Sequence, residues 1–139
     1  LKNKKYDLVM SWAVLYSIDN YKNLIKKIFL NNTKKYFIFD LRFSFINEDI
    51  IDLNKSFTFY ETKKNKSPYI ITSYKNFKSF ITNDLKGRVK NAFISGYYFN
   101  PSKNVQIKKG IKKPFVGSII LEKGNKIKRC NFIEKIPNV

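Results

Sequence analysis

The residues best suited to chemistry in this 139-residue sequence are Asp40 and Arg42, at the end of an apolar segment. A carboxylate at the end of a strand can orient an acceptor hydroxyl or amine, or take a proton as a general base. The alternative interpretation is structural: an Asp–Arg pair within the chain, or a cap for the next helix. Asp40 is therefore a weak catalytic candidate, and both residues are candidates for contact with a substrate.

Other classes of chemistry are excluded by what the composition lacks. The sequence holds no histidine and a single cysteine, which excludes His-based triads, His-ligated metals, an internal disulfide and multi-cysteine zinc clusters. A reducing, cytoplasmic setting is the default for such a chain. No apolar run approaches the roughly 18–20 residues of a membrane span, so no membrane partner is expected. The cysteine, Cys130, lies in a polar stretch and is assigned no function.

Two apolar segments and the helix between them must position Asp40 and Arg42. Residues 6–12 and 35–41 are apolar on both faces, which is typical of parallel strands covered by helices. Asp19 is a good N-cap for a helix that runs to about Leu30 with apolar residues at helical spacing. The order strand, helix, strand predicts a parallel βαβ unit with a right-handed crossover.

The middle of the chain gives weaker signals. Apolar residues between 46 and 53 suggest a short helix, residues 58–60 a short extended piece, and residues 61–67 a polar loop. Thr72 or Ser73 is predicted to cap a second helix. That helix places four apolar side chains on one face: Tyr74, Phe77, Phe80 and Ile81.

The last third of the chain predicts two strands, at about residues 88–99 and 115–122. The connection between them is too short and too polar for a crossover helix, so we expect antiparallel neighbours. Residues 125–139 form a basic tail that we expect to be loosely held. The predicted fold class is α/β, with a parallel βαβ unit, a helix-bearing segment and a final antiparallel strand pair.

The formal net charge of +18 invites a nucleic-acid interpretation. Of the 28 basic residues, however, 25 are lysine and only three are arginine, the residue that reads base edges and forks onto phosphate. The sequence is also rich in Asn, Ile, Phe and Tyr and poor in Ala and Gly, which is the bias that AT-rich codons produce. Because the lysines are spread over the whole chain, genome base bias is the favoured cause of the charge.

Residues 6–18, with the sequence YDLVMSWAVLYSI, resemble the fourth-strand segment of class I S-adenosylmethionine-dependent methyltransferases. Those enzymes typically show Phe/Tyr-Asp-hydrophobic-Val, a small or polar residue, and a Leu-x-x-Ile pattern. The following helix and residues 36–40 match that family's helix and fifth strand. The late antiparallel pair matches its sixth and seventh strands, whose hairpin departs from a nucleotide-binding Rossmann sheet. The resemblance implies that residues 1–124 form the C-terminal half of a Rossmann-like methyltransferase domain, followed by the tail 125–139.

The sequence also departs from that family. It has no glycine-rich segment after a first strand to bind the methionine part of the cofactor, and no second strand ending in an acid for the ribose. The turn at residues 31–34 lacks the usual glycine. We therefore expect roughly the first three strands to be absent. The resemblance implies a methyltransferase in full-length form, with this chain inactive by itself.

By this resemblance, S-adenosylmethionine is expected against the turn after the first predicted strand, because ligands of open α/β sheets lie beyond the carboxyl ends of strands. The expected cofactor contacts are Ser11, Trp12, Ala13, Leu15 and Tyr16. The alternative is that Trp12 and Leu15 belong to the core. On the substrate side the candidates are Asp40, Arg42 and Tyr69, of which Tyr69 is alternatively a plain packing residue.

The implied activity is methyl transfer to a small-molecule acceptor, which the +18 charge allows to be anionic. Displacement at a sulfonium needs little covalent help, so catalysis would come mainly from holding the acceptor beside the methyl carbon. Residues 11–14 differ from the Asn/Asp-Pro-Pro-Tyr signature of enzymes that methylate the amino groups of bases. Two alternatives stay open: a small basic RNA-binding protein, and a non-catalytic remnant of the methyltransferase fold that acts as an interaction module.

Overall fold

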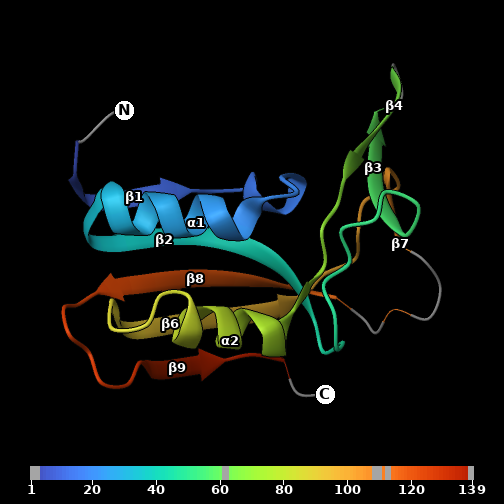
Figure 1. The fold of residues 1–139 in the computed structure, drawn as a ribbon. Helices are drawn as coiled ribbons and strands as arrows, with labels where there is room; N and C mark the ends of the chain where they lie inside the picture. Colours follow the sequence, from blue (N-terminus) through green and yellow to red (C-terminus); the bar gives the residue numbers. More distant parts are fainter. Residues whose placement is uncertain (1–3, 61–62, 108–110, 112–113, 138–139) are drawn as a thin grey trace.

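The computed structural model describes residues 4–60, 63–107, 111 and 114–137, which form two β-sheets and two α-helices (Figure 1). In chain order the elements are β1 (Tyr6–Ser11), a 3-10 turn η1 (Leu15–Ser17), α1 (Tyr21–Asn31), β2 (Thr33–Ser44), β3 (Ser56–Tyr60), β4 (Lys63–Pro68), β5 (Thr72–Ser73), α2 (Tyr74–Asn83), β6 (Val89–Tyr98), β7 (Val105–Ile107), β8 (Phe115–Lys123) and β9 (Asn131–Lys135). Neither α-helix is long and apolar enough to cross a membrane.

The main sheet has the strand order β1-β2-β8-β6-β9, and the short β5 pairs with the end of β2. β1 and β2 are parallel and joined through α1, so the predicted parallel βαβ unit is confirmed. β8 lies between β2 and β6 and is antiparallel to both, which confirms the predicted antiparallel pair. The result is a mixed α/β sheet whose central strands, β2 and β8, are paired along eight residues.

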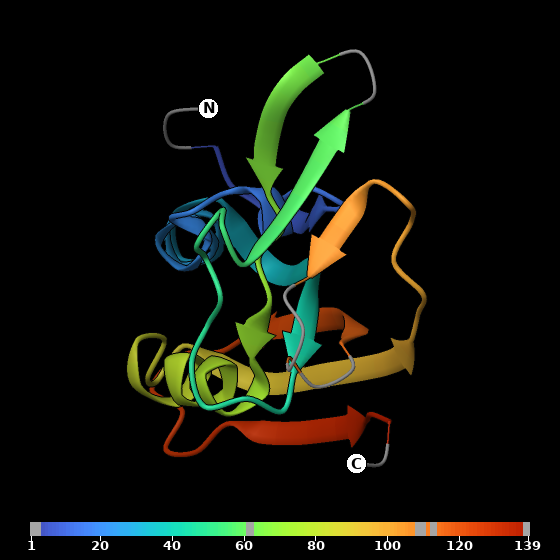
Figure 2. The ribbon, with the colours of Figure 1, turned by 90° about the vertical axis from the view of Figure 1, so that its right-hand side faces the viewer.

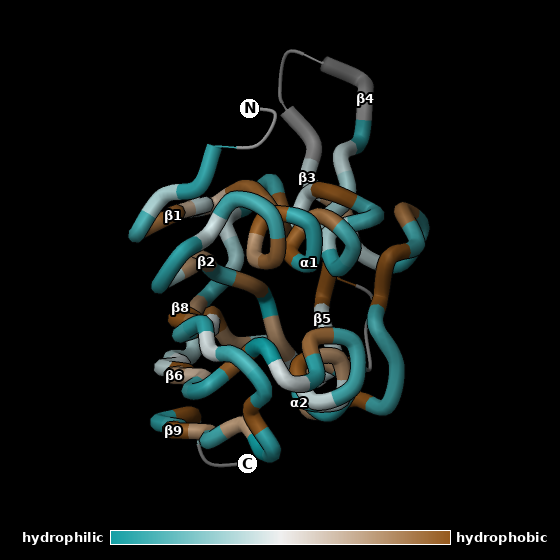
Figure 3. Tube along the Cα trace, turned by 60° about the vertical axis from the view of Figure 1, so that its left-hand side comes forward, coloured by the Kyte–Doolittle hydropathy of each residue, from teal (hydrophilic) through white to brown (hydrophobic). Residues whose placement is uncertain are grey.

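Both helices lie on one side of the main sheet, as Figure 3 shows. Alternate residues of β2 point to that side and are fully buried. These residues are Phe37, Phe39, Leu41 and Phe43. The helix α2 meets them through Phe77, whose ring lies 5.1 Å from that of Phe43, and through the other apolar positions that the sequence predicted for it. Ser73 caps this helix as expected, because its Oγ accepts a hydrogen bond from the N–H of Asn76.

The opposite side of the sheet, which we call the open face, carries no helix among the described residues. Cross-strand partners share a face, and one row of partners on the open face crosses all five strands. This row consists of Met10, Ile38, Ile120, Phe93 and Ile133. Met10 is 66 % exposed and Ile133 45 %. The expectation that helices cover both faces of the first strand is therefore wrong for the described part of the chain.

Four further expectations about local structure are corrected. The N-cap of α1 is Asn20 rather than Asp19. Residues 46–53 form turns and one isolated bridge, Ile50 to Ile71, instead of a helix. Lys63–Pro68 is a strand, although residues 61–67 read as a loop, and residues 61 and 62 lie outside the described residues. The tail is not loosely held throughout, because Asn131–Lys135 pairs in parallel with β6.

The second sheet has the order β4-β3-β7 and is built from segments that interrupt the main sheet's connections. β7 lies within the connection predicted only as a polar link, and it pairs with β3 through partners such as Thr58 and Val105. Figure 2 shows this sheet standing to one side of the main sheet. A hydrogen bond from Ser56 Oγ to the carbonyl oxygen of Tyr69, 2.5 Å long, ties the base of β3 to the segment that leads into β5.

Candidate functional site

The turn after β1 is fixed to the carboxyl end of β2 by the side chain of Asp40. Ala13 has a backbone φ of +57°, in the left-handed region that residues with a side chain rarely adopt. Its N–H donates a hydrogen bond of 2.6 Å to Asp40 Oδ1. Asp40 itself is paired with Ser118 of β8 on its other side, well inside the sheet. The Asp40 carboxylate therefore helps to fix the turn after β1, together with the hydrogen bond of 2.7 Å from the N–H of Ile70 to the carbonyl oxygen of Tyr16.

Arg42 extends this arrangement two residues further along β2. Its Nη1 donates to Asp40 Oδ2 over 2.6 Å, and its Nε donates to the hydroxyl of Tyr69 over 3.2 Å. The guanidinium carbon lies 4.1 Å from the ring centroid of Tyr16, and the rings of Tyr16 and Tyr69 meet edge to face at 5.2 Å. We call these five residues the carboxyl-edge cluster: Ala13, Tyr16, Asp40, Arg42 and Tyr69.

The charges of the carboxyl-edge cluster are almost out of contact with water. The side chain of Asp40 is 2 % exposed and that of Arg42 is 12 %. Burial alone would lower the pKa of Arg42, but the hydrogen bond and charge of Asp40 outweigh it, so the pKa is raised. Burial raises the pKa of Tyr69, against the opposing effect of Arg42. At neutral pH the cluster thus holds a charged guanidinium and a protonated phenol.

The geometry shows the Asp40–Arg42 ion pair that the structural interpretation expected, and the catalytic role of Asp40 stays a prediction. Both oxygens of Asp40 already accept hydrogen bonds, one from the turn after β1 and one from Arg42. The predicted alternative, a pair within the chain, is therefore confirmed. In this arrangement the Asp40 carboxylate orients the turn and the guanidinium, and Tyr69 supports Arg42 while its ring packs on Tyr16. Asp40 stays a weak candidate for proton transfer.

The other residues expected at the cofactor side are divided between core and surface. Leu15 is 1 % exposed and belongs to the core, as its alternative interpretation held. Trp12 is 51 % exposed, so the same interpretation is wrong for Trp12. Ser11, the last residue of β1, is half-buried and pairs with Phe39. Of the five expected cofactor contacts, Trp12 and Ala13 are therefore exposed, and Tyr16, like Ser11, is half-buried.

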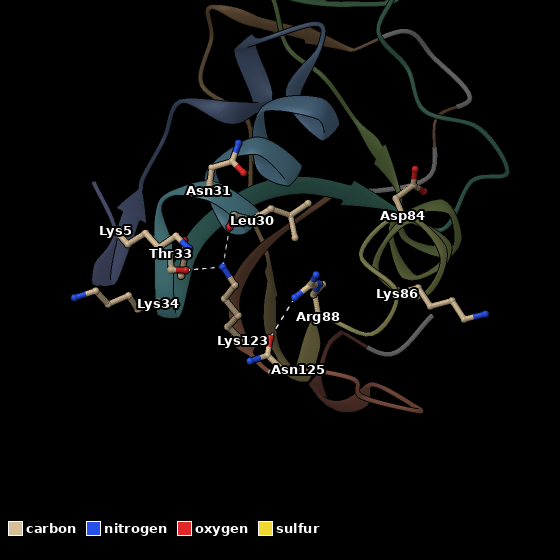
Figure 4. Close-up of a pocket in the computed structure, with 11 residues that line it drawn as sticks. Lys5, Leu30, Asn31, Thr33, Lys34, Asp84, Lys86, Arg88, Lys123 and Asn125 are labelled. Carbon is tan, nitrogen blue, oxygen red and sulfur yellow. Dashed lines mark hydrogen bonds between the residues drawn. The ribbon is translucent and has the colours of Figure 1, made fainter. Parts of the chain in front are cut away.

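A second feature lies at the other end of the main sheet and was missed in the sequence. It is a polar hollow of about 710 Å³ near the amino ends of β1 and β2, shown in Figure 4. Five cationic side chains line it, and we call it the basic hollow: Lys5, Lys34, Lys86, Arg88 and Lys123. These residues are far apart in the sequence. Only the strand order could have indicated that they meet.

Metal and thiol chemistry gain no support from the described part of the chain. No group of three or more His, Cys, Asp or Glu side chains there could hold a metal ion. Cys130 is half-buried, and burial raises the pKa of its thiol to about 11, which keeps it protonated at neutral pH. The absence of a function for Cys130 stays a prediction.

Comparison with known proteins gives no relative on which the site could be interpreted. No protein-family model matches the sequence, and searches of curated proteins and of solved structures give no match. The two regions described above, the carboxyl-edge cluster and the basic hollow, are therefore interpreted from their own geometry.

Proposed function

We propose that this chain supplies the C-terminal half of a class I S-adenosylmethionine-dependent methyltransferase that acts on a small-molecule acceptor. The observation that carries the proposal is the arrangement of the main sheet. The parallel unit β1-α1-β2 continues, in the same sheet, into the antiparallel pair β8 and β6. This is the succession that the resemblance implies for the fourth to seventh strands of that family.

The position of the carboxyl-edge cluster gives a second argument. Ligands of open α/β sheets bind beyond the carboxyl ends of the parallel strands, and the cluster lies where β1 and its pairing with β2 end, at Ser11 and Phe39. In the proposal, the cofactor lies against the turn that contains Trp12 and Ala13, together with Ser11, Leu15 and Tyr16. The acceptor lies on the side of Asp40, Arg42 and Tyr69. The exposed ring of Trp12 is the side chain best placed to cover a ligand.

The open face of the sheet gives a third argument. Parallel strands in α/β proteins usually have helices on both faces, so their side chains are apolar on both sides. Here the open face exposes large apolar side chains in the described part of the chain, including Leu8 at 54 % and Met10 at 66 %. Both belong to β1, which pairs with β2 along one edge. In the proposal, the N-terminal half of the domain packs against this face and continues the sheet from β1.

The chemistry assigned to the chain is positioning rather than proton transfer. Bound S-adenosylmethionine supplies a methyl group on a positively charged sulfur. The acceptor must be held in line with that methyl carbon, and water must be excluded. Asp40 holds the turn after β1 in place through its bond to Ala13. Arg42, stacked on Tyr16, fixes the wall between the cofactor side and the acceptor side.

The first experiment is to sequence the coding region upstream of Leu1 and to express the whole reading frame. Trp12 is the only tryptophan of the present chain, so its fluorescence reports on the proposed cofactor side when any other tryptophan is replaced by phenylalanine. We expect a strand, a glycine-rich turn and a second strand ending in an acid upstream. Titration with S-adenosylmethionine should then change Trp12 emission saturably, and labelled methyl groups should appear in an acceptor pool.

Two variants separate the proposed site from general stability. Trp12→Ala should weaken cofactor binding, measured by calorimetry, by about tenfold, because it removes an exposed aromatic contact. Ile51→Ala is the matched control, since Ile51 is a 39 % exposed apolar residue of the loop between β2 and β3. A reading frame that starts near Leu1 would overturn the proposal. So would a folded longer protein that binds no cofactor, which would favour the interaction-module alternative.

A further inference from the structure

The basic hollow forms where the amino ends of parallel strands meet the carboxyl end of an antiparallel one. Lys5 precedes β1, Lys34 is the second residue of β2, and Lys123 ends β8, which runs in the opposite direction. Lys86 and Arg88 come from the turn between α2 and β6. Cations from distant parts of the sequence therefore line one depression of about 710 Å³, with Arg88 and Lys123 at its centre and the side chains of Lys34 and Lys86 extending outward on opposite sides (Figure 4).

The charge of the basic hollow is not neutralised within the described part of the chain. The ion pairs in the described part of the chain involve five other cations, none of which lines the hollow: Lys22, Lys35, Arg42, Lys78 and Lys90. Asp84 is the single acid among the lining residues. Burial, followed by the charges of Lys5 and Arg88, lowers the pKa of Lys123. Like charges are thus crowded closely enough to affect one another.

Lys123 forms the floor of the hollow and is held in place by three hydrogen bonds to the end of α1. Its ammonium donates to the carbonyl oxygens of Phe29 and Leu30, both at 2.9 Å, and of Thr33 at 2.6 Å. These carbonyls lie at the C-terminal end of α1, where a cation is favoured. The other four cations are exposed and line the hollow around this floor. Among the described residues none of the four is in an ion pair, although Arg88 Nη1 donates a hydrogen bond of 3.2 Å to Asn125 Oδ1 within the hollow.

We propose that the basic hollow binds the phosphate groups of a single-stranded nucleic acid. A depression of this volume accommodates a ligand of nucleotide size, and its separated cations suit successive phosphates better than one. Two exposed tyrosines lie on the neighbouring strands, Tyr6 at 43 % and Tyr36 at 40 %. Neither ring is part of the lining of the hollow, but Tyr36 lies two residues after Lys34 in β2, so these two side chains share a face of the sheet. Aromatic rings beside a basic groove are the usual means of stacking unpaired bases.

The competing explanation for the lysines of the hollow is genome base bias, which adds lysines without regard to their position in the fold. Under that explanation, removal of any three exposed cations has the same effect on binding. The proposal predicts that position matters. The hollow variant, K34Q/K86Q/R88Q, removes three exposed cations of the hollow and keeps the capping Lys123. The control variant, K55Q/K75Q/K103Q, removes three exposed lysines from segments that do not line it.

The experiment measures binding of a short fluorescein-labelled single-stranded RNA by anisotropy, between about 50 and about 200 mM salt. We expect the hollow variant to bind at least about tenfold more weakly at low salt, and the slope of log affinity against log salt to fall by about 2, since three contacts each contribute about 0.7. The control variant should lose less than about threefold. Circular dichroism melting checks that each variant is folded, and the single variant R88Q, with an expected slope change of about 0.7, replaces any that is not.

Several results would overturn the proposal. Equal losses in the hollow and control variants would favour base bias. In a second such result, unlabelled pyrophosphate displaces the labelled RNA as well as unlabelled RNA does at the same concentration of phosphate groups. That result would mean that the hollow is a site for a small phosphate anion. Tighter binding to vesicles containing anionic lipid than to RNA would favour a membrane surface. Absence of RNA binding by the unchanged protein at low salt would end the proposal directly.

Discussion

At the carboxyl ends of β1 and β2, an acid and a base are buried together, whereas at the amino ends of the same strands five cations surround one hollow with a single acid. Asp40 and Arg42 have almost no access to water, so neither charge is tolerable without the other. The cations of the basic hollow are mostly exposed, and water screens their repulsion. The buried pair therefore belongs to the fold, whereas the exposed cations can serve a ligand.

The largest effect is expected from Asp40→Asn, which tests the buried side of this comparison. The substitution leaves the guanidinium of Arg42 buried without its counter-charge and weakens the acceptor for the N–H of Ala13. We expect a loss of about 3 to 5 kcal/mol in the free energy of unfolding, measured by urea denaturation.

The control for this prediction is Asp7→Asn near the amino end. Asp7 pairs with Lys35 at 3.8 Å, and both side chains are about two-thirds exposed, at 65 % and 67 %. Exposed pairs of this kind contribute little, so we expect a change below about 0.5 kcal/mol. Equal effects of the two substitutions would contradict the distinction between the two ends of the sheet.

A smaller effect is expected from Lys123→Met, which removes the one cation of the basic hollow that serves the fold. Three carbonyl oxygens at the end of α1 lose their donor, while the repulsion from Lys5 and Arg88 is relieved. We expect a net loss of about 1 to 2 kcal/mol in thermal or chemical denaturation.

Lys90→Met provides the comparison for Lys123→Met. Lys90 is a lysine of β6 whose side chain is 58 % exposed and which pairs with Glu122 at 3.2 Å. Its replacement should change the free energy of unfolding by less than about 0.5 kcal/mol. If Lys123→Met stabilised the protein instead, repulsion within the hollow would outweigh the capping of α1. The distinction between Lys123, which stabilises the fold, and the other cations of the hollow would then be wrong.

The parts of the fold that could be predicted are those encoded locally. The helix α1 carries Tyr21, Ile25 and Phe29 at a four-residue spacing, and all three are buried. Ser73 marks the start of α2 through its own hydrogen bond. The strands β4 and β9 were missed because each is polar or short and is defined by a distant partner. In β9, for example, Phe132 pairs with Ala92, forty residues earlier.

The candidate site divides in the same way. Asp40 and Arg42 could be selected because they lie at the end of the apolar segment, which is a local signal, although β2 itself continues to Ser44. Their partners, Ala13 and Tyr69, are each 27 residues away in the sequence from the side chain they bind, so those hydrogen bonds could not be derived. The basic hollow was missed because its cations are even more widely separated in the sequence. They come together only through the order of the strands and the antiparallel direction of β8.

A still smaller effect is expected from Glu134, which neutralises a cation on the helix-covered side of the sheet. Burial alone would raise the pKa of Glu134, but hydrogen bonds from Tyr74 and Lys78 outweigh it and lower the pKa below the usual value. A carboxylate with a lowered pKa stabilises the fold above its unfolded pKa, and this contribution is lost as the pH falls through the folded pKa. Glu134→Gln should therefore cost less than about 1 kcal/mol at neutral pH.

The same variant tests the sign of this effect. The difference in free energy of unfolding between the unchanged protein and Glu134→Gln should shrink as the pH is lowered from about 6 to about 3. Urea denaturation at several pH values measures it. A difference that grows toward acid pH would mean that Glu134 is destabilised by its burial, and that its bonds to Tyr74 and Lys78 do not help to hold β9.

The smallest effect is that of salt on the free energy of unfolding. It distinguishes the charges at the two ends of the sheet without any substitution. Salt screens exposed charges and leaves buried pairs almost unaffected, so adding sodium chloride should relieve repulsion in the basic hollow but not weaken the pair of Asp40 and Arg42. We expect the unchanged protein to gain about 0.5 kcal/mol of stability between low and physiological salt. The hollow variant should gain less, because three of the repelling charges are gone, and the control variant should gain as much as the unchanged protein. If all three proteins responded alike, the cations of the hollow would repel one another no more than lysines elsewhere on the surface. A bound anion would then gain nothing from relieving that repulsion.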